Sequence, residues 1–333
     1  MMFAEIALFP RQASTTASQV DLLLLFLLTI CGAVTLLVGF LLVCFSVRYR
    51  RRPGEVGNPA ETPPSRALEW FWTLTPLAFF MVMYVWGAEV YFGAYRPPSD
   101  ASTIYVVGKQ WMWKFQHPEG QREINRLHVP VGRPIRLLMT SEDVIHSLFI
   151  PDFRLHMDLL PGRYTSVWFQ ASRPGTYRLF CSQYCGTNHA GMTGLVIAME
   201  PAEYDAWLHS GAEGSMALEG RKVFLKYRCA SCHSANAEAR APVLENLFRS
   251  PVVLNDGSVV EADENYLRES IVAPSAKIVA GYENIMPTFQ GQVSEEEIFE
   301  LIAFIQSLKP GETPKRVETY PPPTTTPPIN TKE

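Results

Sequence analysis

The sequence is poor in histidine, which limits the metal chemistry that the chain can perform alone. Its 333 residues include seven histidines, and the two long apolar runs near the N-terminus contain none. A metal or haem site held by several histidines inside a membrane is therefore excluded for this chain. A large histidine-rich metal domain is excluded for the same reason.

Charged residues are missing from the same two runs. Residues 22–47 carry no charge, and residues 70–88 form a second uncharged apolar run. Each meets the roughly 20 residues that a helix needs to cross a membrane. The averages conceal this, because a net charge of −4 and 47% hydrophobic residues would suit an ordinary soluble protein. We therefore expect a two-helix transmembrane hairpin within residues 1–95, with spans at about 22–47 and 70–90.

Basic residues are scarce before the first span and abundant after it. Only Arg11 precedes the span, whereas Arg48, Arg50, Arg51 and Arg52 follow it. The positive-inside rule then places the loop between the spans in the cytoplasm and both chain ends outside. A cleaved signal peptide is the alternative for the first span, but such peptides have a shorter apolar region and a basic start. The pattern favours a retained anchor.

One short segment concentrates soft metal ligands. The run CSQYCGTNHAGM contains Cys181, Cys185, His189 and Met192. Two thiolates, an imidazole and a thioether favour copper over magnesium, calcium or a structural zinc. A zinc site or a disulfide between the two cysteines is the alternative. Zinc loops rarely recruit methionine, however, and a disulfide would leave the histidine and methionine spacing unexplained.

The second cysteine of this loop indicates a second copper ion. A site with one copper needs one cysteine, two histidines and a weak methionine ligand. Two cysteines four residues apart can instead bridge two ions. A second histidine must come from elsewhere, and His146 in SEDVIHSLFIPDFR, between two strand-like runs, is the best candidate. His146 and His189 would then cap one copper each.

A haem-attachment motif follows later in the chain. Cys229, Cys232 and His233 form C-x-x-C-H, in which both thiols bond to the porphyrin and the histidine is placed to bind the iron. Met286 is predicted as the second axial ligand because it lies in a loop between two helical segments, and a Met/His pair raises the haem potential. The alternatives are a thioredoxin-like pair or half a zinc site for the motif, and a core methionine for Met286.

Beyond the hairpin, the sequence pattern changes twice. From residue 99 to 201, short β-rich runs recur between Pro and Gly turns, which predicts an all-β sandwich with the copper loop between its last two strands. Residues 216–309 carry helical patterns instead and predict an all-α domain around the haem. We expect a linker at 202–215 and a disordered Pro/Thr-rich tail at 310–333. The helices of the second domain are expected at 216–228, 263–273 and 294–308.

These motifs together resemble a known family. The copper loop, the upstream HSLFIPDF, the aromatic run KQWMWKF and the two apolar runs are similar to subunit II of the haem–copper cytochrome c oxidases, which holds the binuclear copper A (CuA) centre. This resemblance covers about residues 12–200. Residues 216–309 resemble a class I cytochrome c domain, as in the branch with cytochrome c fused to subunit II. The resemblance implies a cupredoxin-like sandwich after the transmembrane hairpin.

The resemblance also implies roles for three further residues. Trp111 would lie over the copper centre where electrons enter, although an aromatic core position is the default for such a residue. Glu69 would lie at the mouth of a proton pathway into subunit I, with a flanking interfacial acid as the alternative. Gln183 stands where the family usually has glutamate. Its backbone carbonyl can still bind copper, but a neutral amide is a poorer ligand for a magnesium or manganese ion at the border with subunit I.

The sequence therefore predicts the electron-accepting subunit of a bacterial respiratory cytochrome c oxidase. Electrons would pass from a covalent haem c to CuA and on to haem in subunit I, where oxygen reduction is coupled to proton translocation. Expected partners are subunit I with haem a and copper B, further membrane subunits, and a donor that is a cytochrome c, a copper protein or a quinol-oxidising complex. No nucleic-acid partner is expected. Both redox domains should face the outer side of the bacterial cytoplasmic membrane.

Two other functions are compatible with the same motifs. One is a free-standing membrane-anchored electron carrier, and the other is the dicopper domain of an enzyme similar to nitrous-oxide reductase. The low histidine count argues against the second. Under the main hypothesis, a flexible linker would make transfer from haem to copper intramolecular, at an effective concentration in the mM range. The haem domain has nine basic and thirteen acidic residues, a surplus that would attract a basic donor.

Overall fold

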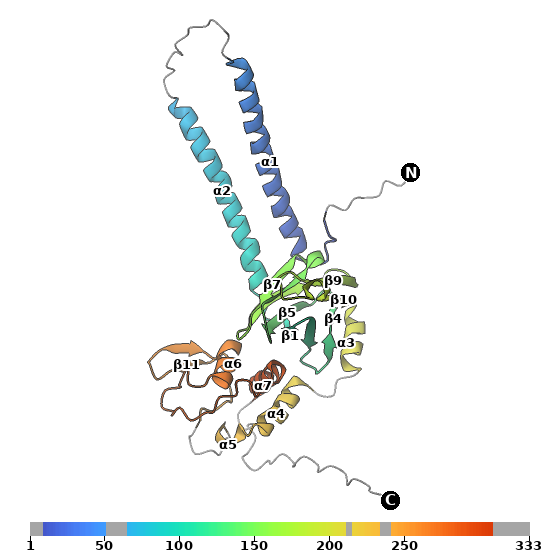
Figure 1. Cartoon of the computed structure of the whole chain (residues 1–333), viewed down its shortest axis with the longest axis vertical. Helices are drawn as coiled ribbons and strands as arrows, with labels where there is room; N and C mark the ends of the chain where they lie inside the picture. The colour runs from blue at the N-terminus through green and yellow to red at the C-terminus, as the bar shows by residue number, and fades with distance from the viewer. Residues whose placement is uncertain (1–8, 51–64, 211–214, 234–240, 309–333) are drawn as a thin grey trace, which may run out of the picture.

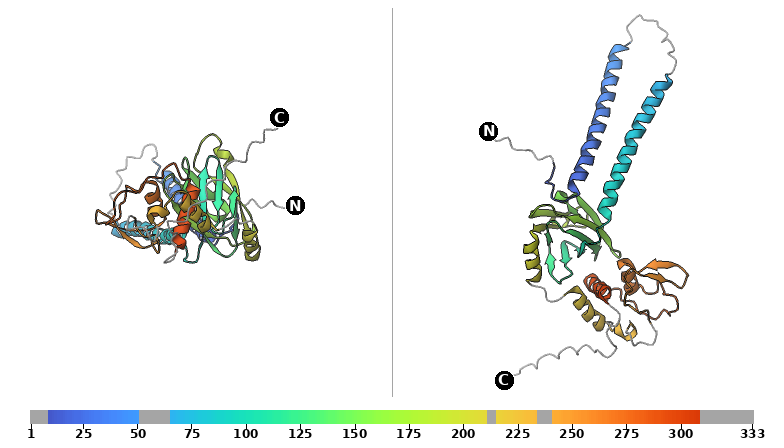
Figure 2. Two further views of the ribbon diagram at one scale, coloured as in Figure 1. Left: turned by 90° about the horizontal axis from the view of Figure 1, so that it is seen from below. Right: turned by 180° about the vertical axis from the view of Figure 1, so that it is seen from behind.

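The computed structural model describes residues 9–50, 65–210, 215–233 and 241–308. Two long helices lie side by side and lead into a β-sandwich, and a smaller, mainly helical domain packs on the other side of the sandwich (Figure 1; Figure 2). The expected disordered tail at 310–333 lies outside the described residues. The same holds for most of the loop between the two helices.

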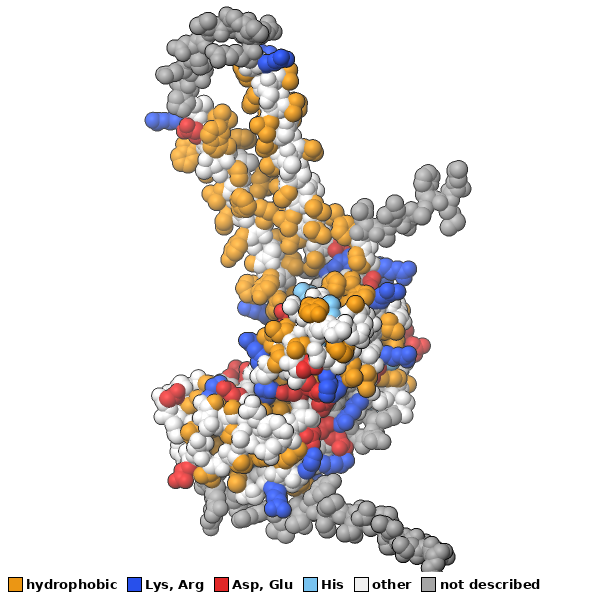
Figure 3. Space-filling view, viewed as in Figure 1, with side chains coloured by type: hydrophobic (Ala, Val, Ile, Leu, Met, Phe, Trp, Pro, Cys, Tyr) orange, Lys and Arg blue, Asp and Glu red, His pale blue; other side chains and the backbone are white. Residues whose placement is uncertain are grey.

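The two helices, α1 (Ala17–Arg48) and α2 (Arg66–Tyr95), have the properties of membrane spans. The most apolar windows have mean hydropathies of 2.7 and 1.5, and none of their residues is buried within the protein. Hydrophobic side chains cover both helices in Figure 3. A continuous apolar surface of this size needs a lipid or protein partner. Both helices are longer than the predicted spans because each extends beyond its uncharged run.

The sandwich consists of two five-stranded sheets in the orders β3-β2-β1-β5-β8 and β4-β10-β9-β6-β7. Their inner faces form one buried core that includes Trp113, Phe115 and Phe169. The β-rich runs expected between residues 99 and 201 all form strands, namely β1, β2, β5, β6, β8, β9 and β10. The short strands β3, β4 and β7 were not predicted because charged residues or histidines interrupt their apolar pattern. The strands are β1 (Ser102–Lys109), β2 (Met112–Gln116), β3 (Arg122–Ile124), β4 (Arg126–Pro130), β5 (Pro134–Ser141), β6 (His146–Ile150), β7 (Leu155–Leu159), β8 (Thr165–Gln170), β9 (Gly175–Cys181) and β10 (Thr193–Met199).

The start of α1 and the end of α2 are fixed to the sandwich by hydrogen bonds. The guanidinium group of Arg154 donates two hydrogen bonds of 2.8 Å to the carboxylate of Asp21, in the second turn of α1. Both side chains are largely buried, so this bidentate pair is shielded from solvent. The indole of Trp168 donates a 2.8 Å hydrogen bond to the carbonyl of Gly93, near the end of α2. These contacts set the orientation of the sandwich relative to the membrane helices.

The predicted linker is partly helical. Residues Pro201–His209 form α3, which buries Tyr204 and Leu208 against the sandwich. The segment expected as a linker at 202–215 thus begins with a helix, because two apolar side chains one turn apart give it a face to bury. Residues 211–214 lie outside the described range.

The C-terminal domain contains the three predicted helices, α4 (Met216–Lys226), α6 (Glu264–Val272) and α7 (Glu295–Ser307), together with the short α5 (Ala230–His233). Helices α4 and α7 cross very closely. A Cβ atom at Gly220 would lie 1.9 Å from the carbonyl oxygen of Glu300, so this crossing requires glycine. A small hairpin of β11 (Pro251–Val253) and β12 (Val259–Glu261) was not predicted, because its strands are only three residues long.

The two domains are packed together. Tyr105, Val107, Leu138 and Tyr164 on the outer face of the first sheet belong to the same buried cluster as Phe299 and its neighbours in the helical domain. The structure thus replaces the expected flexible tether by a packed interface. A fixed interface determines which surfaces of the two domains face each other, which a tether would not.

Candidate copper and haem sites

The six predicted copper ligands lie together at one end of the sandwich. The sulfur atoms of Cys181 and Cys185 are 3.8 Å apart and occupy the centre of the group. On one side, Nδ1 of His146 is 4.0 Å and the carbonyl oxygen of Gln183 is 3.2 Å from the Cys181 sulfur. On the other, Nδ1 of His189 is 3.5 Å and the Met192 sulfur 3.8 Å from the Cys185 sulfur.

This arrangement fits two soft metal ions better than one. Each sulfur has an imidazole nitrogen of its own nearby, and the two thiols are close enough to be shared by two ions. A single tetrahedral zinc would leave two of the six donors unused. The described residues contain one cluster of potential metal ligands built from His, Cys, Asp or Glu, namely His146, Cys181 and Cys185. The donor set therefore matches a dicopper centre.

One sheet, the one that contains β6, β9 and β10, carries the ligand loop. Strand β9 ends at Cys181, a short 3-10 turn contains His189, and β10 begins directly after Met192. Strand β6 begins at His146 and pairs with β9, so that Leu148 lies opposite Cys181. Gly186 has a φ of 117°, a conformation that favours glycine, and allows the loop to turn back toward β10. Loops carried by a rigid frame can place ligands accurately.

Asp143 supports His146 from outside the ligand group. Because Nδ1 of His146 faces the cysteine sulfur, Nε2 is the nitrogen that donates to Asp143, at 2.8 Å. The Asp143 carboxylate also accepts hydrogen bonds from the backbone N–H groups of Gln110 and Val144. A carboxylate behind a metal-binding histidine fixes its tautomer and ring orientation. Sequence reasoning missed Asp143, although its position three residues before His146 was a possible signal.

The two thiols differ in acidity. Burial acts to raise the pKa of Cys181, but the interaction with the His146 ring and the backbone hydrogen bond at Ser147 outweigh it and lower that pKa. Burial raises the pKa of Cys185, and the neighbouring Cys181 thiolate raises it further. The first proton therefore leaves the pair easily and the second is held. Bound metal cations favour the doubly deprotonated pair, since thiolates are the ligands.

Trp111 lies over the copper loop, as the resemblance implies. Its indole N–H donates a 3.3 Å hydrogen bond to the carbonyl of Cys185, and the Gln110 side chain donates to the same oxygen at 2.8 Å. Trp111 is half-buried and packs against the core of the sandwich.

Two further residues named in the sequence analysis are exposed. The side chain of Gln183 is exposed, so it can face a partner. Glu69 is exposed near the start of α2, at the other end of the helix hairpin from the sandwich (Figure 1).

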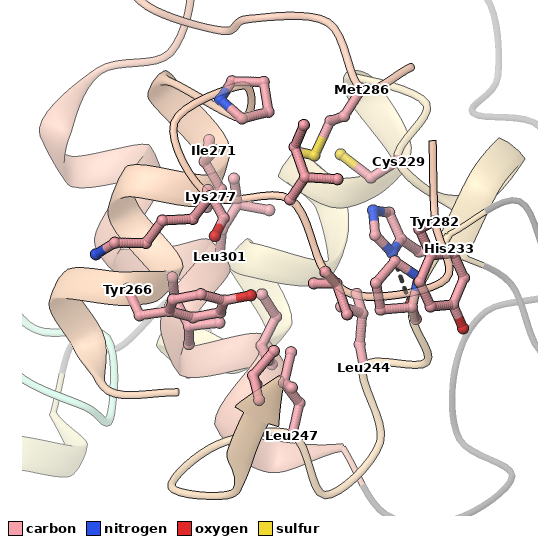
Figure 4. Close-up of a pocket in the computed structure, with 18 of the residues that line it drawn as sticks. Cys229, His233, Leu244, Leu247, Tyr266, Ile271, Lys277, Tyr282, Met286 and Leu301 are labelled. Atoms are coloured by element: carbon pink, nitrogen blue, oxygen red, sulfur yellow. Dashed lines mark hydrogen bonds between the residues drawn. The ribbon is translucent and has the colours of Figure 1, made fainter. Parts of the chain in front are cut away.

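The helical domain contains a cavity of about 420 Å³, a size typical of cofactor sites. Cys229, His233 and Met286 all line it, and Figure 4 shows the sulfur atoms of Cys229 and Met286 close together above the His233 ring. Cys232 is half-exposed and is not among the lining residues. Met286 lies in the long segment between α6 and α7, as predicted. The remaining lining is mostly apolar and includes Phe224, Leu244, Leu267, Ile271, Leu301 and Ile305.

The His233 ring is suited to bind iron. Its Nδ1 is 3.0 Å from the carbonyl oxygen of Pro242, so Nδ1–H donates to that oxygen and leaves Nε2 without the proton. Burial lowers the pKa of His233, which keeps the ring neutral. A neutral imidazole with its second nitrogen fixed by a carbonyl is a typical haem ligand. The apolar walls, the Cys229 thiol and the two axial candidates therefore fit a haem group.

Three family models match most of the chain and leave residues 89–120 and 200–216 outside their ranges. The family model "Cytochrome C oxidase subunit II, transmembrane domain" matches residues 3–88. The model "Cytochrome C oxidase subunit II, periplasmic domain" matches residues 121–199. The model "Cytochrome c" matches residues 217–309.

Individual relatives carry related names. Cytochrome c oxidase subunit 2 of Alkalihalophilus pseudofirmus is 29% identical, over 84% of this chain and 84% of that protein. Cytochrome c oxidase subunit 2 of Synechocystis sp. is 29% identical, over 62% of this chain and 76% of that protein. Among solved structures, the periplasmic domain of subunit II of cytochrome oxidase of Bradyrhizobium japonicum is 31% identical. It matches 34% of this chain and 96% of that domain, with a TM-score of 0.33.

Proposed function

Because this chain belongs to the cytochrome c oxidase subunit II family and carries a cytochrome c domain, we propose that it accepts electrons at a covalent haem c and passes them to CuA. From there they reach haem in subunit I. The chain is a component of an oxidoreductase of the inner membrane and has two membrane spans. The observation that carries the proposal is the group of six donors, two thiols with two imidazoles, a thioether and a carbonyl around them. The domain that holds this group is packed against a second domain with a cavity of about 420 Å³.

The proposed ligands act in two sets. Cys181 and Cys185 would hold the copper pair as thiolates, together with the imidazoles of His146 and His189, the Met192 thioether and the carbonyl of Gln183. Cys229 and Cys232 would attach the porphyrin, while His233 and Met286 would supply the ligands of its iron. These groups, when bound, supply one-electron acceptors and donors. The protein excludes water from them and holds their ligands in place.

We also propose that both sites face the outside of the membrane. The start of α1 and the end of α2 lie at the sandwich (Figure 1), while Arg48 lies at the far end of α1. Arginines after the first span favour a cytoplasmic position for that far end. The sandwich and the haem domain are then on the opposite side, where Trp111 and the haem cavity are accessible to a donor.

The order of electron transfer tests this proposal. In the purified oxidase, rapid anaerobic mixing with a limiting amount of a one-electron reductant should reduce the haem c before the copper centre. The visible absorbance of haem c and the near-infrared absorbance of CuA report the two steps separately. Reduction of the copper centre while the haem c stays oxidised, and at a rate independent of it, would show that the haem is not the acceptor.

Gln183 predicts weak binding of a divalent ion at the border with subunit I. We expect the Gln183→Glu oxidase to retain more manganese than the unchanged enzyme after growth in manganese, because a carboxylate is a better ligand for a hard dication than an amide. Paramagnetic resonance of bound Mn(II) measures this. The control is Gln290→Glu, the same change at an exposed position of the haem domain. Equal manganese content in all three enzymes would contradict the prediction.

A further inference from the structure

Three ion pairs among the described residues join the two domains, and in all of them the basic residue belongs to the same domain. Arg136 of the sandwich pairs with Glu264 of α6 at 2.8 Å, and Lys114 pairs with Glu296 of α7 at 2.5 Å. Arg122 of the sandwich also pairs with Glu300 of α7. In each pair the sandwich supplies the base and the haem domain supplies the acid, and Figure 3 shows acidic and basic side chains gathered where the domains meet.

This complementarity fixes the orientation of the haem domain. It also weakens the expectation that the acidic haem domain attracts a basic donor, because Glu264, Glu296 and Glu300 form ion pairs within the chain. These three acids are therefore not available to attract an external partner.

An aromatic cluster lies at the centre of this contact. The ring of Phe299 is fully buried between Tyr105 and Tyr164, with centroid distances of 4.9 Å and 4.8 Å. Phe299 belongs to α7, whose residues Leu301 and Ile305 line the haem cavity. Residues 301 and 305 share one face of the helix, and residue 299 lies on nearly the opposite face. A single helix thus separates the haem cavity from the aromatic cluster.

The same cluster is connected to a copper ligand through one strand. Tyr105 belongs to β1, and three residues further along β1 the backbone of Gly108 lies against the His146 ring. A Cβ atom at Gly108 would be 2.9 Å from Cδ2 of that ring. Gly108 is paired with Trp113, whose ring meets the ring of His146 edge-on at a centroid distance of 6.1 Å. Packed protein atoms therefore extend without interruption from α7 to His146.

We propose that Phe299, Tyr105 and strand β1 form the route by which an electron crosses from the haem c to the dicopper site. The inference rests on the proposed function and adds the residues that carry the step. One electron leaves the haem iron, which is oxidised, and enters the copper pair, which is reduced. No bond forms or breaks and no proton moves. Trp111, whose contacts lie with the copper loop and the sandwich core, then remains outside this internal step.

The physical basis is packing. Electron tunnelling weakens steeply with distance and with gaps between atoms, and a void deprives the surrounding atoms of their contacts. Phe299→Ala would leave such a void at the contact between the two domains. Tyr105→Leu would remove the ring on the sandwich side without altering α7. Tyr105→Phe keeps the ring and removes only the hydroxyl.

The test is the rate of haem-to-copper transfer in the complete oxidase after photoreduction of haem c by a laser flash. We expect Phe299→Ala and Tyr105→Leu each to slow this transfer about tenfold, as a packed contact is replaced by a gap. Tyr105→Phe should leave the rate within about twofold of the unchanged enzyme, because it keeps the packed ring. Unaltered haem and copper spectra and midpoint potentials would show that both sites are intact.

The outcomes separate the two proposals. If the unchanged oxidase shows no transfer from haem c to copper, the proposed function fails. If it shows transfer but Phe299→Ala and Tyr105→Leu do not slow it, the proposed route is wrong. Slowing by Tyr105→Phe as large as that by Tyr105→Leu would show that the packed ring does not carry the step, and would also overturn the route. Should Phe299→Ala fail to assemble, Tyr105→Leu and Tyr105→Phe decide the question by themselves.

Discussion

Replacing Cys181 with serine is expected to abolish the dicopper centre and leave the haem in place. A serine hydroxyl stays protonated at neutral pH and is a hard donor, so it cannot replace a thiolate that bridges two coppers. The Cys181 sulfur lies 3.8 Å from the Cys185 sulfur and beside His146, so both ions would lose a shared ligand. Copper bound to this subunit should fall below two ions, and Cys185→Ser should have the same effect.

Paramagnetic resonance gives the clearest measurement of this loss. One unpaired electron shared over two coppers has a hyperfine pattern distinct from that of a single copper, and this pattern should vanish in both variants. Cys31→Ser and Cys44→Ser are matched controls, because they make the same change in α1, away from the ligand group. The copper assignment is wrong if the unchanged protein shows a single-copper spectrum, contains zinc, or has a disulfide between Cys181 and Cys185.

Removing both thiols of the haem motif is expected to eliminate covalent haem. In the Cys229→Ser/Cys232→Ser variant, neither serine can form a thioether bond to the porphyrin, so haem staining of the subunit on a denaturing gel should be lost. The haem cavity lies in the core of its domain, beside Phe224 and Leu301, so loss of haem should also destabilise that domain. Copper content should persist, since all six copper donors belong to the sandwich.

Ser231→Ala provides the matched control for this variant. Ser231 lies between the two cysteines, and its hydroxyl donates a hydrogen bond to the carbonyl of Arg228. Its removal leaves both thiols and His233 unchanged, so covalent haem should remain. Haem staining that survives the double cysteine change would refute the attachment motif. Simultaneous loss of haem and copper would indicate that the sandwich itself depends on the haem domain for folding.

Local chemistry is what made much of the site predictable. The copper loop and the haem motif are short, so the types and spacing of their side chains reveal the ligands before any fold is known. His146 was identified as well, because a second imidazole was needed and the flanking runs were strand-like. The two spans were evident because lipid tolerates few charges over some 20 residues.

Other parts of the site arise only where distant segments meet. Asp143 behind His146 and the Pro242 carbonyl behind His233 depend on loop conformations that no spacing rule specifies. The short strands β3, β4 and β7 depend on partners in the sheets, which override their weak local preference. Helix α3 forms for the same reason, because the sandwich covers its apolar face.

The sequence by itself determined the two spans and the candidate ligands, since each is read from side chains that are neighbours along the chain. Only the tertiary structure decided that the haem domain is docked rather than tethered, and that Phe299 and Tyr105 meet at the contact. The reason is physical. Complementary charges and apolar faces separated by well over a hundred residues have no sequence signal of their own. They interact only when folding brings them within contact distance.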